Sequence, residues 1–417
     1  MANILGVIAE FNPFHNGHSY FIEEAKKACN ADYVIAVMSG SFTQRGLPAI
    51  INKWDRTELA LQNGADMVIE LPTLYSVSSA ENFASGGIKI LKKIGIINYI
   101  AFGAETNDIK TLTDISKILA DENEEYKLKL KEELGKGLSF PKARENAIID
   151  YLKNNSNADK CNKKLENLTE ENIKQVLSKS NNILAIEYLK AMERQHFNVT
   201  HIMIKRESDN GKTNLTSATE IRKGLSDKSY VEHNLANYVP KDVYNKIREN
   251  IANNTYYQDL EPLSKIIIYK IRMMKTEEIA NVPDVSEGLE NTIKNAAFET
   301  NSINNLISKV KSKRYTETRI QRILTCILLG ITKDDKEMSK TIVPYVRVLG
   351  VKKDAKQLLS KIPNAVISIK EFEDNNANEN LKRMLDFDKK SSDIYSIGYN
   401  GNHSLANLDY TKKLIVI

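Results

Sequence analysis

Short apolar runs alternate with helix-like segments through the first hundred residues. The runs at 4–9, 33–38, 67–71 and 99–102 are almost continuously apolar, as in strands that are buried on both faces. Between them, residues 18–29, 53–63 and 84–94 repeat apolar positions at helical spacing. This alternation predicts a doubly wound parallel sheet with helices on both faces, whose ligands bind beyond the carboxyl ends of the strands.

The pattern changes after residue 108. Residues 108–180 are helical in pattern and strongly charged, and a helix at 181–195 and a last strand at 199–204 follow. From about Pro240 helical patterns dominate, at 263–275, 289–305 and 318–329. We predict a Rossmann-like α/β domain over 1–235 with a helical insertion at about 108–180, and a mainly helical domain over 236–417. The Asn-rich and acidic stretch 371–380 is expected to be a mobile loop.

Composition places the chain among ordinary globular proteins. Of 417 residues, 41% are hydrophobic and 27% are charged, and 59 Lys and Arg against 54 Asp and Glu leave a net charge of +5. Three widely spaced cysteines, Cys29, Cys161 and Cys326, exclude a disulfide framework and a CxxC metal site. We expect a cytoplasmic protein without a secretory signal or a membrane span.

Two histidines stand between the first strand and the first helix. His15 and His18 are separated by Asn16 and Gly17, at the N-terminus of the predicted helix. Free backbone N–H groups of a first helical turn bind anions, and imidazole donors can stabilise the charge on a phosphate under attack. The alternative is that the pair caps the helix and lies on the surface. A zinc site has no further ligands at suitable spacing.

The segment EFNPFHNGH at 10–18 resembles the H-x-G-H signature of the nucleotidyltransferase superfamily. Further motifs narrow the resemblance to the bacterial tRNA(Met) cytidine acetate ligase family: MSGSFTQRG at 38–46, PA at 48–49, KW at 53–54, NGADMVIELP at 63–72, FGAE at 102–105, NNIL at 181–184 and SKRYT at 312–316. The chain departs from the family at Ser180, where proline is usual, and in the loop at 207–212.

This resemblance implies an ATP-dependent ligase. Acetate and ATP, taken up as Mg-ATP, would give acetyladenylate, and the acetyl group would pass to N4 of the wobble cytidine of elongator tRNA(Met). His15 and His18 would be catalytic, and no protein ligand for a metal is expected. The ATP-binding residues implied are Ile8, Ala9, Glu10, Phe11, Asn12, Pro13, Phe14, His15, Asn16, Gly17, His18, Ser19, Tyr20, Phe21, Gly103, Asn181 and Arg206. The segment SATEIR at 217–222 resembles a phosphate clamp near the end of nucleotidyltransferase domains.

The positive charge is concentrated in one segment. Residues 308–322, SKVKSKRYTETRIQR, contain six basic residues and one acidic residue, an excess equal to that of the whole chain. Such a block beside a tyrosine can contact RNA phosphates and stack on a base, whereas the alternative is a solvated helix face. With the resemblance, we predict that tRNA is bound by Lys309, Lys311, Lys313, Arg314, Tyr315 and Arg319.

Two other functions stay open from the sequence. One is a small-metabolite adenylating enzyme on the same fold, similar to pantothenate synthetases or to enzymes that form nicotinate nucleotides. The other is a non-catalytic RNA-binding protein. The basic block argues against the first, and the intact His15, Gly17 and His18 argue against the second. The sequence leaves the oligomeric state open.

Overall fold

The apolar runs of the N-terminal part form parallel strands. The computed structural model describes residues 2–156, 168–206, 214–375, 377–399 and 405–417. Within these residues one sheet has the strand order β5-β4-β1-β2-β3-β6-β7, and β8 pairs with β6. The strands that run parallel to one another are β1 (Ile4–Ala9), β2 (Tyr33–Ser39), β3 (Met67–Leu71), β4 (Tyr99–Ala104) and β5 (Thr200–Lys205). The predicted parallel α/β core is confirmed.

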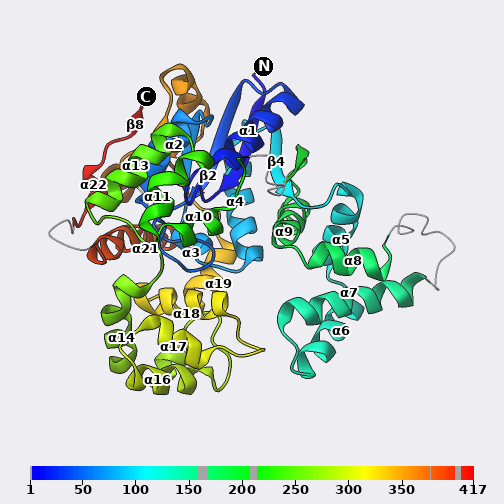
Figure 1. Cartoon of the computed structure of the whole chain (residues 1–417). Coiled ribbons are helices and arrows are strands. Elements are labelled where there is room, and N and C mark those ends of the chain that lie inside the picture. The colour runs from blue at the N-terminus through cyan, green and yellow to red at the C-terminus, as the bar shows by residue number, and fades with distance from the viewer. Residues whose placement is uncertain (1, 157–167, 207–213, 376, 400–404) are drawn as a thin grey trace.

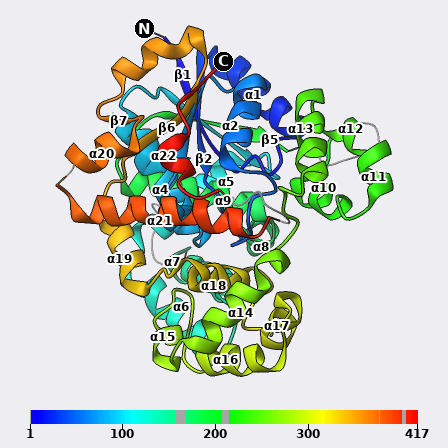
Figure 2. The ribbon, with the colours of Figure 1, turned by 90° about the vertical axis from the view of Figure 1, so that its left-hand side faces the viewer.

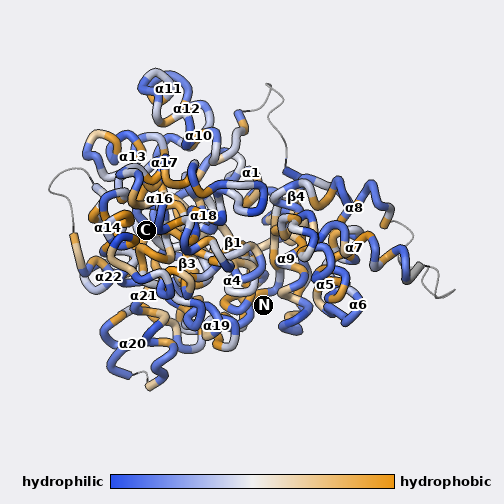
Figure 3. Tube along the Cα trace, turned by 90° about the horizontal axis from the view of Figure 1, so that it is seen from below, coloured by the Kyte–Doolittle hydropathy of each residue, from blue (hydrophilic) through white to orange (hydrophobic). Residues whose placement is uncertain are grey.

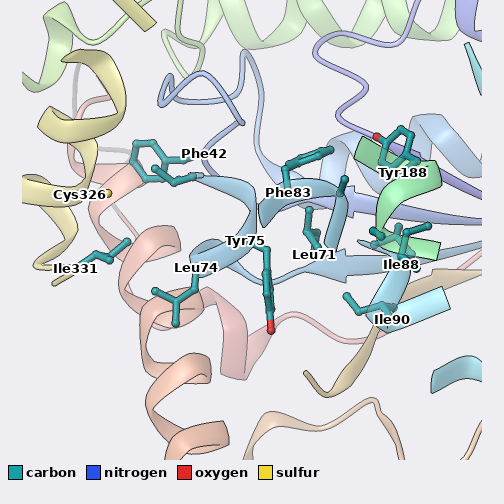
Figure 4. Close-up of a cluster of buried hydrophobic side chains, with 14 of the residues drawn as sticks. Phe42, Leu71, Leu74, Tyr75, Phe83, Ile88, Ile90, Tyr188, Cys326 and Ile331 are labelled. Carbon is teal, nitrogen blue, oxygen red and sulfur yellow. The ribbon is translucent and has the colours of Figure 1, made fainter. Parts of the chain in front are cut away.

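Alternate strand residues enter two cores, one on each face of the sheet. On one face Leu5 packs with α1 (Asn16–Cys29) and α2 (Lys53–Gln62). On the other face Ile35 packs with α3 (Thr73–Ser76), α4 (Ala80–Ile94) and α9 (Ser180–Arg194). Figure 4 shows part of this second core, with Phe83 of α4 and Tyr188 of α9. Burial on both faces explains why β1 to β4 are almost continuously apolar.

Strand β1 lies at the switch point of the sheet. The chain passes from β1 to β2 and β3 in one direction and then returns to β4 on the other side of β1. At such a point the loops after neighbouring strands diverge and leave a crevice at the carboxyl ends. The segment with His15 and His18 follows β1 directly, so the topology places it at this crevice.

The charged segment after β4 forms the helices of the insertion. These are α5 (Ile109–Asp121), α6 (Glu124–Gly135), α7 (Phe140–Ser156) and α8 (Glu170–Leu177), and they extend to one side of the sheet (Figure 1). After β5 the chain continues through α10 (Ala218–Gly224), α11 (Lys228–His233), α12 (Leu235–Tyr238) and α13 (Lys241–Ala252). The divergent loop at 207–212 lies outside the described residues.

A group of helices lies beyond the carboxyl ends of the strands (Figure 2). It comprises η1 (Glu261–Leu263), α14 (Ser264–Met273), α15 (Thr276–Ala280), α16 (Leu289–Glu299), α17 (Ile303–Val310), α18 (Glu317–Leu329) and α19 (Lys333–Thr341). The helical stretch expected at 289–305 is divided between two helices. Thr300 has an extended backbone, and Ser302 caps a new helix by accepting from the Asn305 N–H, so the chain turns between α16 and α17.

The C-terminal part returns to the sheet. Strand β6 (Val346–Val351) pairs antiparallel with β3, and β7 (Ala365–Val366) and β8 (Ile415–Val416) pair with β6. The sheet therefore crosses the boundary expected at about residue 235. The remaining elements are η2 (Lys353–Lys361), α20 (Ile369–Asn375), α21 (Glu379–Ile397) and α22 (Leu408–Thr411).

The mobile loop expected at 371–380 was wrong for most of its length. Residues 371–375 belong to α20, and Glu379 begins α21 behind the capping side chain of Asn378. Apolar side chains of α20 and α21, such as Ile369 and Leu385, are buried in the larger core, which holds these helices in place. That core runs from the sheet into the α14–α18 group. Figure 3 shows hydrophobic segments gathered at the centre and hydrophilic ones along the outer helices.

Candidate active site

A cavity of about 630 Å³ opens at the carboxyl ends of β1, β4 and β5. Most of the predicted ATP-binding residues line it: Ile8, Ala9, Glu10, Phe11, Asn12, His15, Gly17, His18, Tyr20, Phe21, Gly103, Asn181 and Arg206. Pro13, Phe14, Asn16 and Ser19 do not. Phe14 is buried against Phe11 and His18, and the Asn16 side chain donates to the carbonyls of Asn214 and Asn237. Phe14 therefore packs within the loop at 10–18, and Asn16 ties this loop to the segments that contain Asn214 and Asn237.

The two imidazoles meet at the N-terminus of α1. His15 is the N-cap, and its Nδ1 accepts from the Gly17 N–H at 3.1 Å. The Nδ1 of His18 accepts from the His15 N–H at 3.2 Å, which closes a capping box. The ring centroids are 3.8 Å apart. Since each Nδ1 is an acceptor, the proton of each neutral ring is on Nε2, which is the donor that remains for a ligand.

Burial keeps both histidines neutral. Desolvation, followed by the charges of Arg206 and Arg222, lowers the pKa of His15 to about 3. Desolvation and the neighbouring His15 lower the pKa of His18 well below its ordinary value of 6.5. At neutral pH the pair therefore supplies hydrogen-bond donors, whereas the positive charge of the cavity comes from arginines.

Arg206 is held by a network that joins β4, β5 and α9. Its guanidinium donates to Asn181 Oδ1 at 2.7 Å, and Asn181 Nδ2 donates to Glu105 Oε1 at 2.6 Å. A Cβ on Gly103 would lie 3.2 Å from Arg206 Cγ. Glycine at this position thus gives room to the aliphatic part of Arg206. Asn181 orients the guanidinium at the edge of the cavity.

A second arginine enters the cavity from α10. Arg222 donates to the carbonyl of Asn12 at 2.6 Å and to Thr219 Oγ1 at 3.1 Å. Ser217 caps α10 by accepting from the Glu220 N–H, and both Ser217 and Thr219 line the cavity. The sequence motif at 217–222 had pointed to this position, although Arg222 was not among the predicted ATP ligands.

The loop between β2 and α2 supplies cavity residues that the sequence reading missed. Gln44 and Arg45 line the cavity, and the Gln44 N–H donates to Glu10 Oε1 at 2.6 Å. The signal was available, because these residues follow the end of a predicted strand. Phe83 and Tyr188 also line the cavity. They lie within helices rather than directly after a predicted strand, so no signal in the sequence pointed to them.

The same loop contacts α18. Thr325 Oγ1 donates to the Gly46 carbonyl at 2.5 Å. Gly46 has φ +77°, and a Cβ there would lie 2.5 Å from the Arg322 backbone nitrogen. Arg45, next to Gly46, is exposed at the edge of the cavity. The loop therefore joins the cavity to α18, whose first turns contain the end of the predicted basic block.

Most cations of the basic block have partners within the chain. Lys309 pairs with Glu299 at 2.6 Å, and Lys311 pairs with Glu317 at 2.8 Å. Arg319 and Arg322 both bind Asp284, at its carbonyl and its carboxylate. In the described part of the chain only Lys313 and Arg314 of this block are exposed cations without an ion pair.

Tyr315 is half-buried at the base of the same segment. Its hydroxyl shares a hydrogen bond with Ser286 at 3.1 Å, and the Arg319 guanidinium lies 5.0 Å from its ring centroid. One face of the ring is therefore occupied by a neighbour of the same block. The exposed charge is concentrated on the loop at 311–316.

The comparisons with known proteins agree with this geometry. The model of the HIGH Nucleotidyl Transferase family matches residues 2–409. A curated relative from Acetivibrio thermocellus, "tRNA(Met) cytidine acetate ligase", is 41% identical over 99% of this chain and 100% of its own length. The chain belongs to the tRNA(Met) cytidine acetate ligase family. A relative of the same name from Thermoanaerobacter sp. (strain X514) is 39% identical over 99% of both chains.

A solved structure of this family matches the whole fold. The crystal structure of Thermotoga maritima TmcAL bound with alpha-thio ATP superposes with a TM-score of 0.91, at 30% identity and 99% coverage of both chains. Within the described residues of the present chain, no group of three His, Cys, Asp or Glu side chains is arranged to hold a metal ion. Nor does any helix among them combine the length and the apolar character that a bilayer span requires.

Proposed function

We propose that this chain is an ATP-dependent tRNA(Met) cytidine acetate ligase, which activates acetate as acetyladenylate and acetylates N4 of the wobble cytidine of elongator tRNA(Met). The observation that carries the proposal is the pair of neutral imidazoles at the start of α1, facing a cavity that also contains Arg206 and Arg222. The full-length similarity to ligases of this name supports the choice of substrates.

In the first step an acetate oxygen attacks the α-phosphorus of ATP, and pyrophosphate leaves. His15 and His18 donate from Nε2 to phosphate oxygens on which negative charge gathers, and Arg206 and Arg222 neutralise that charge. Arg206 can bind two oxygens at once because its fork is held by Asn181. Mg²⁺ arrives as part of the Mg-ATP substrate, which agrees with its usual binding through phosphates.

For the tRNA, we assign the first contacts to Lys313 and Arg314 on the loop before α18. Lys309, Lys311, Tyr315 and Arg319 lie on the same segment and would extend the interface where an RNA phosphate displaces an internal partner. The contact between Gly46 and α18 supports an approach of the tRNA from the Gln44 side of the cavity. Residues 1–235 would then bind ATP and acetate, and residues 236–417 would hold the tRNA.

The proposed site of action is the cytoplasm, where tRNA is modified. The two cysteines in the described residues, Cys29 and Cys326, are buried free thiols, which suits a reducing compartment.

The test uses the purified full chain with ATP, labelled acetate and tRNA. We expect ATP-dependent label in elongator tRNA(Met), and acetate-dependent exchange of pyrophosphate into ATP without tRNA. His18→Ala should abolish both, while His233→Ala, the same change at an exposed position on α11, should keep both. Exchange that needs another carboxylate instead of acetate would favour a small-metabolite adenylating enzyme. RNA binding without any exchange would favour a non-catalytic RNA-binding protein.

A further inference from the structure

Among the described residues that line the cavity, Glu10 is the one carboxylate. Glu10 follows β1 directly, and the other charged lining residues are the cations Arg45, Lys205, Arg206 and Arg222. A carboxylate at this place repels both the phosphates of ATP and the carboxylate of acetate, so it weakens the binding of the two substrates of the first step. Its presence calls for a role in a different step.

The charge of Glu10 is not used in a structural ion pair. Its Oε1 accepts from the Gln44 backbone N–H at 2.6 Å, and no cation in the described part of the chain forms an ion pair with it. The buried phenol of Tyr188 is near, since the charge of Glu10 adds to desolvation in raising the pKa of that tyrosine. Tyr188 lines the same cavity.

The Glu10 side chain points away from three of the proposed nucleotide ligands, although its charge still acts on Arg222. Gly103, Asn181 and Arg206 are on the β4 and β5 side of β1. The Glu10 side chain reaches the other way, to Gln44 after β2. Gln44 Nε2 in turn donates to the Ser78 carbonyl at 3.0 Å, which fixes the partner of Glu10.

The backbone of Glu10 is fixed as well. The fully buried Arg56 donates to the Glu10 carbonyl at 2.8 Å and to the Ser39 carbonyl at 3.0 Å. Glu10 is thus held at its backbone carbonyl and at one carboxylate oxygen, and the loop that binds this oxygen also contacts α18.

We propose that Glu10 receives the exocyclic amino group of the acceptor cytosine and serves as the base of acetyl transfer. The assignment rests on the proposed function. Proteins can recognise cytosine through a carboxylate that accepts a hydrogen bond from its N4 amino group. Neither the phosphates of ATP nor acetate has such a donor, so only the acceptor base can make this contact. The carboxylate that is unfavourable for adenylation is therefore suited to the second half of the reaction.

The transfer step balances with Glu10 as the base. The N4 nitrogen attacks the acetyl carbonyl carbon of acetyladenylate and forms the new C–N bond, and the bond from that carbon to the phosphate oxygen breaks, which releases AMP. One proton of the amino group passes to a Glu10 carboxylate oxygen. Since the lone pair of this amine is delocalised into the ring, removal of the proton in the transition state is a large part of the acceleration required.

The decisive variant is Glu10→Gln. The amide oxygen can still accept from the Gln44 N–H, so the local geometry is kept while the charge and the basicity are lost. Two rates are measured: acetate-dependent pyrophosphate exchange without tRNA, and single-turnover acetyl transfer from enzyme preloaded with acetyladenylate. We expect the transfer rate to fall roughly 100-fold more than the exchange rate. Glu23→Gln, the same change at an exposed position of α1, should leave the ratio of the two rates as in the wild type.

Equal losses in both rates would place Glu10 in the adenylation step and overturn the proposal, and so would an unchanged transfer rate. If the Gln variant fails to fold, Glu10→Asp decides alone. Its carboxylate is set back by one methylene, so its transfer rate should fall about 10-fold more than its exchange rate, and an unchanged ratio would refute the role. A wild-type chain that shows neither exchange nor transfer would instead refute the proposed function.

Discussion

A buried cluster of four charges joins the C-terminal end of the chain to the sheet. Lys53 Nζ donates to Glu70 Oε1 at 2.7 Å and to Asp409 Oδ1 at 2.6 Å. Arg347 donates to Glu70 Oε2 at 2.7 Å and to the same Asp409 oxygen at 2.5 Å. The two cations and two carboxylates balance, and no side chain of the cluster is more than 6% exposed. We predict that Asp409→Asn destabilises the fold because it leaves two buried cations with one carboxylate.

The size of the effect follows from the structure in two ways. Removing one partner of a buried ion pair destabilises a protein by about 3–5 kcal/mol. Burial alone would raise the pKa of Asp409, but Lys53 and Arg347 outweigh it and lower the pKa from 3.8 to about 2. That difference corresponds to roughly 2 kcal/mol of stability, which is present above pH 3.8 and is lost as the pH falls toward 2. We expect a loss of about 3 kcal/mol at pH 7.

Urea unfolding followed by tryptophan fluorescence measures this loss. The single tryptophan, Trp54, is buried and adjoins Lys53, so it reports on the cluster itself. Glu379→Gln removes a carboxylate that is 84% exposed, and it should change the stability by less than about 0.5 kcal/mol. Combining Asp409→Asn with Arg347→Met restores the charge balance and should recover part of the loss.

The reasoning would be refuted if Asp409→Asn lost less than about 1 kcal/mol, a change no larger than that of an average point mutation. It would also be refuted if the double variant were destabilised by the full sum of its two single changes, since groups in one cluster must couple.

Three further outcomes follow from the structure. Replacing both Lys313 and Arg314 by Ala should weaken tRNA binding about 10-fold or more at low salt, while acetate-dependent pyrophosphate exchange persists. Filter binding measures the affinity for tRNA, and the exchange assay measures adenylation. A variant that binds tRNA with wild-type affinity would contradict the assigned interface. Gly46→Ala should lower the melting temperature by several degrees and slow tRNA acetylation, because its φ is +77° and its Cβ would meet the Arg322 backbone at 2.5 Å; thermal unfolding of the variant checks this. Burial lowers the pKa of His15 to about 3, so on acidification the unfolded chain takes up a proton at this side chain before the folded chain does. As the pH falls from 7 to 5, this difference should lower the free energy of unfolding by about 2 kcal/mol. Over the same interval the free energy of unfolding of His15→Asn should fall by about 2 kcal/mol less than that of the wild type. Parallel pH profiles of the variant and the wild type would contradict the burial of a neutral imidazole.

The elements near the site could be predicted because their signals are local. The runs that became β1 to β4 are largely apolar on both faces, and each is followed within a few residues by a polar or glycine-containing segment. His15 and His18 stand where a strand gives way to a helix, so their place at a helix N-terminus follows from a dozen consecutive residues. Such patterns depend on backbone geometry that each segment adopts by itself.

The elements that were missed depend on distant partners. Strand β6 is buried along its whole length, but its antiparallel pairing with β3 joins residues that are about 280 positions apart in the sequence. The stretch 371–380 is polar enough to suggest a loop, yet the apolar residues beside it are buried in the core and extend the helices. Likewise Phe83 and Tyr188 became cavity residues only because α4 and α9 cover the same face of the sheet.

The sequence by itself determined the parallel core, the place of the histidine pair and the family, because these rest on periodicity and short motifs. The tertiary structure decided which titratable side chains are charged and which partners the charged side chains have. It made both histidines neutral by burying them beside Arg206, and it paired four of the six cations of the basic block, which leaves Lys313 and Arg314 exposed. It also set Glu10 beside Gln44 and closed the cluster around Asp409. The reason is physical: the ionisation and the partners of a charged side chain depend on its burial and on neighbours within a few ångströms, and the folded chain supplies these from distant positions.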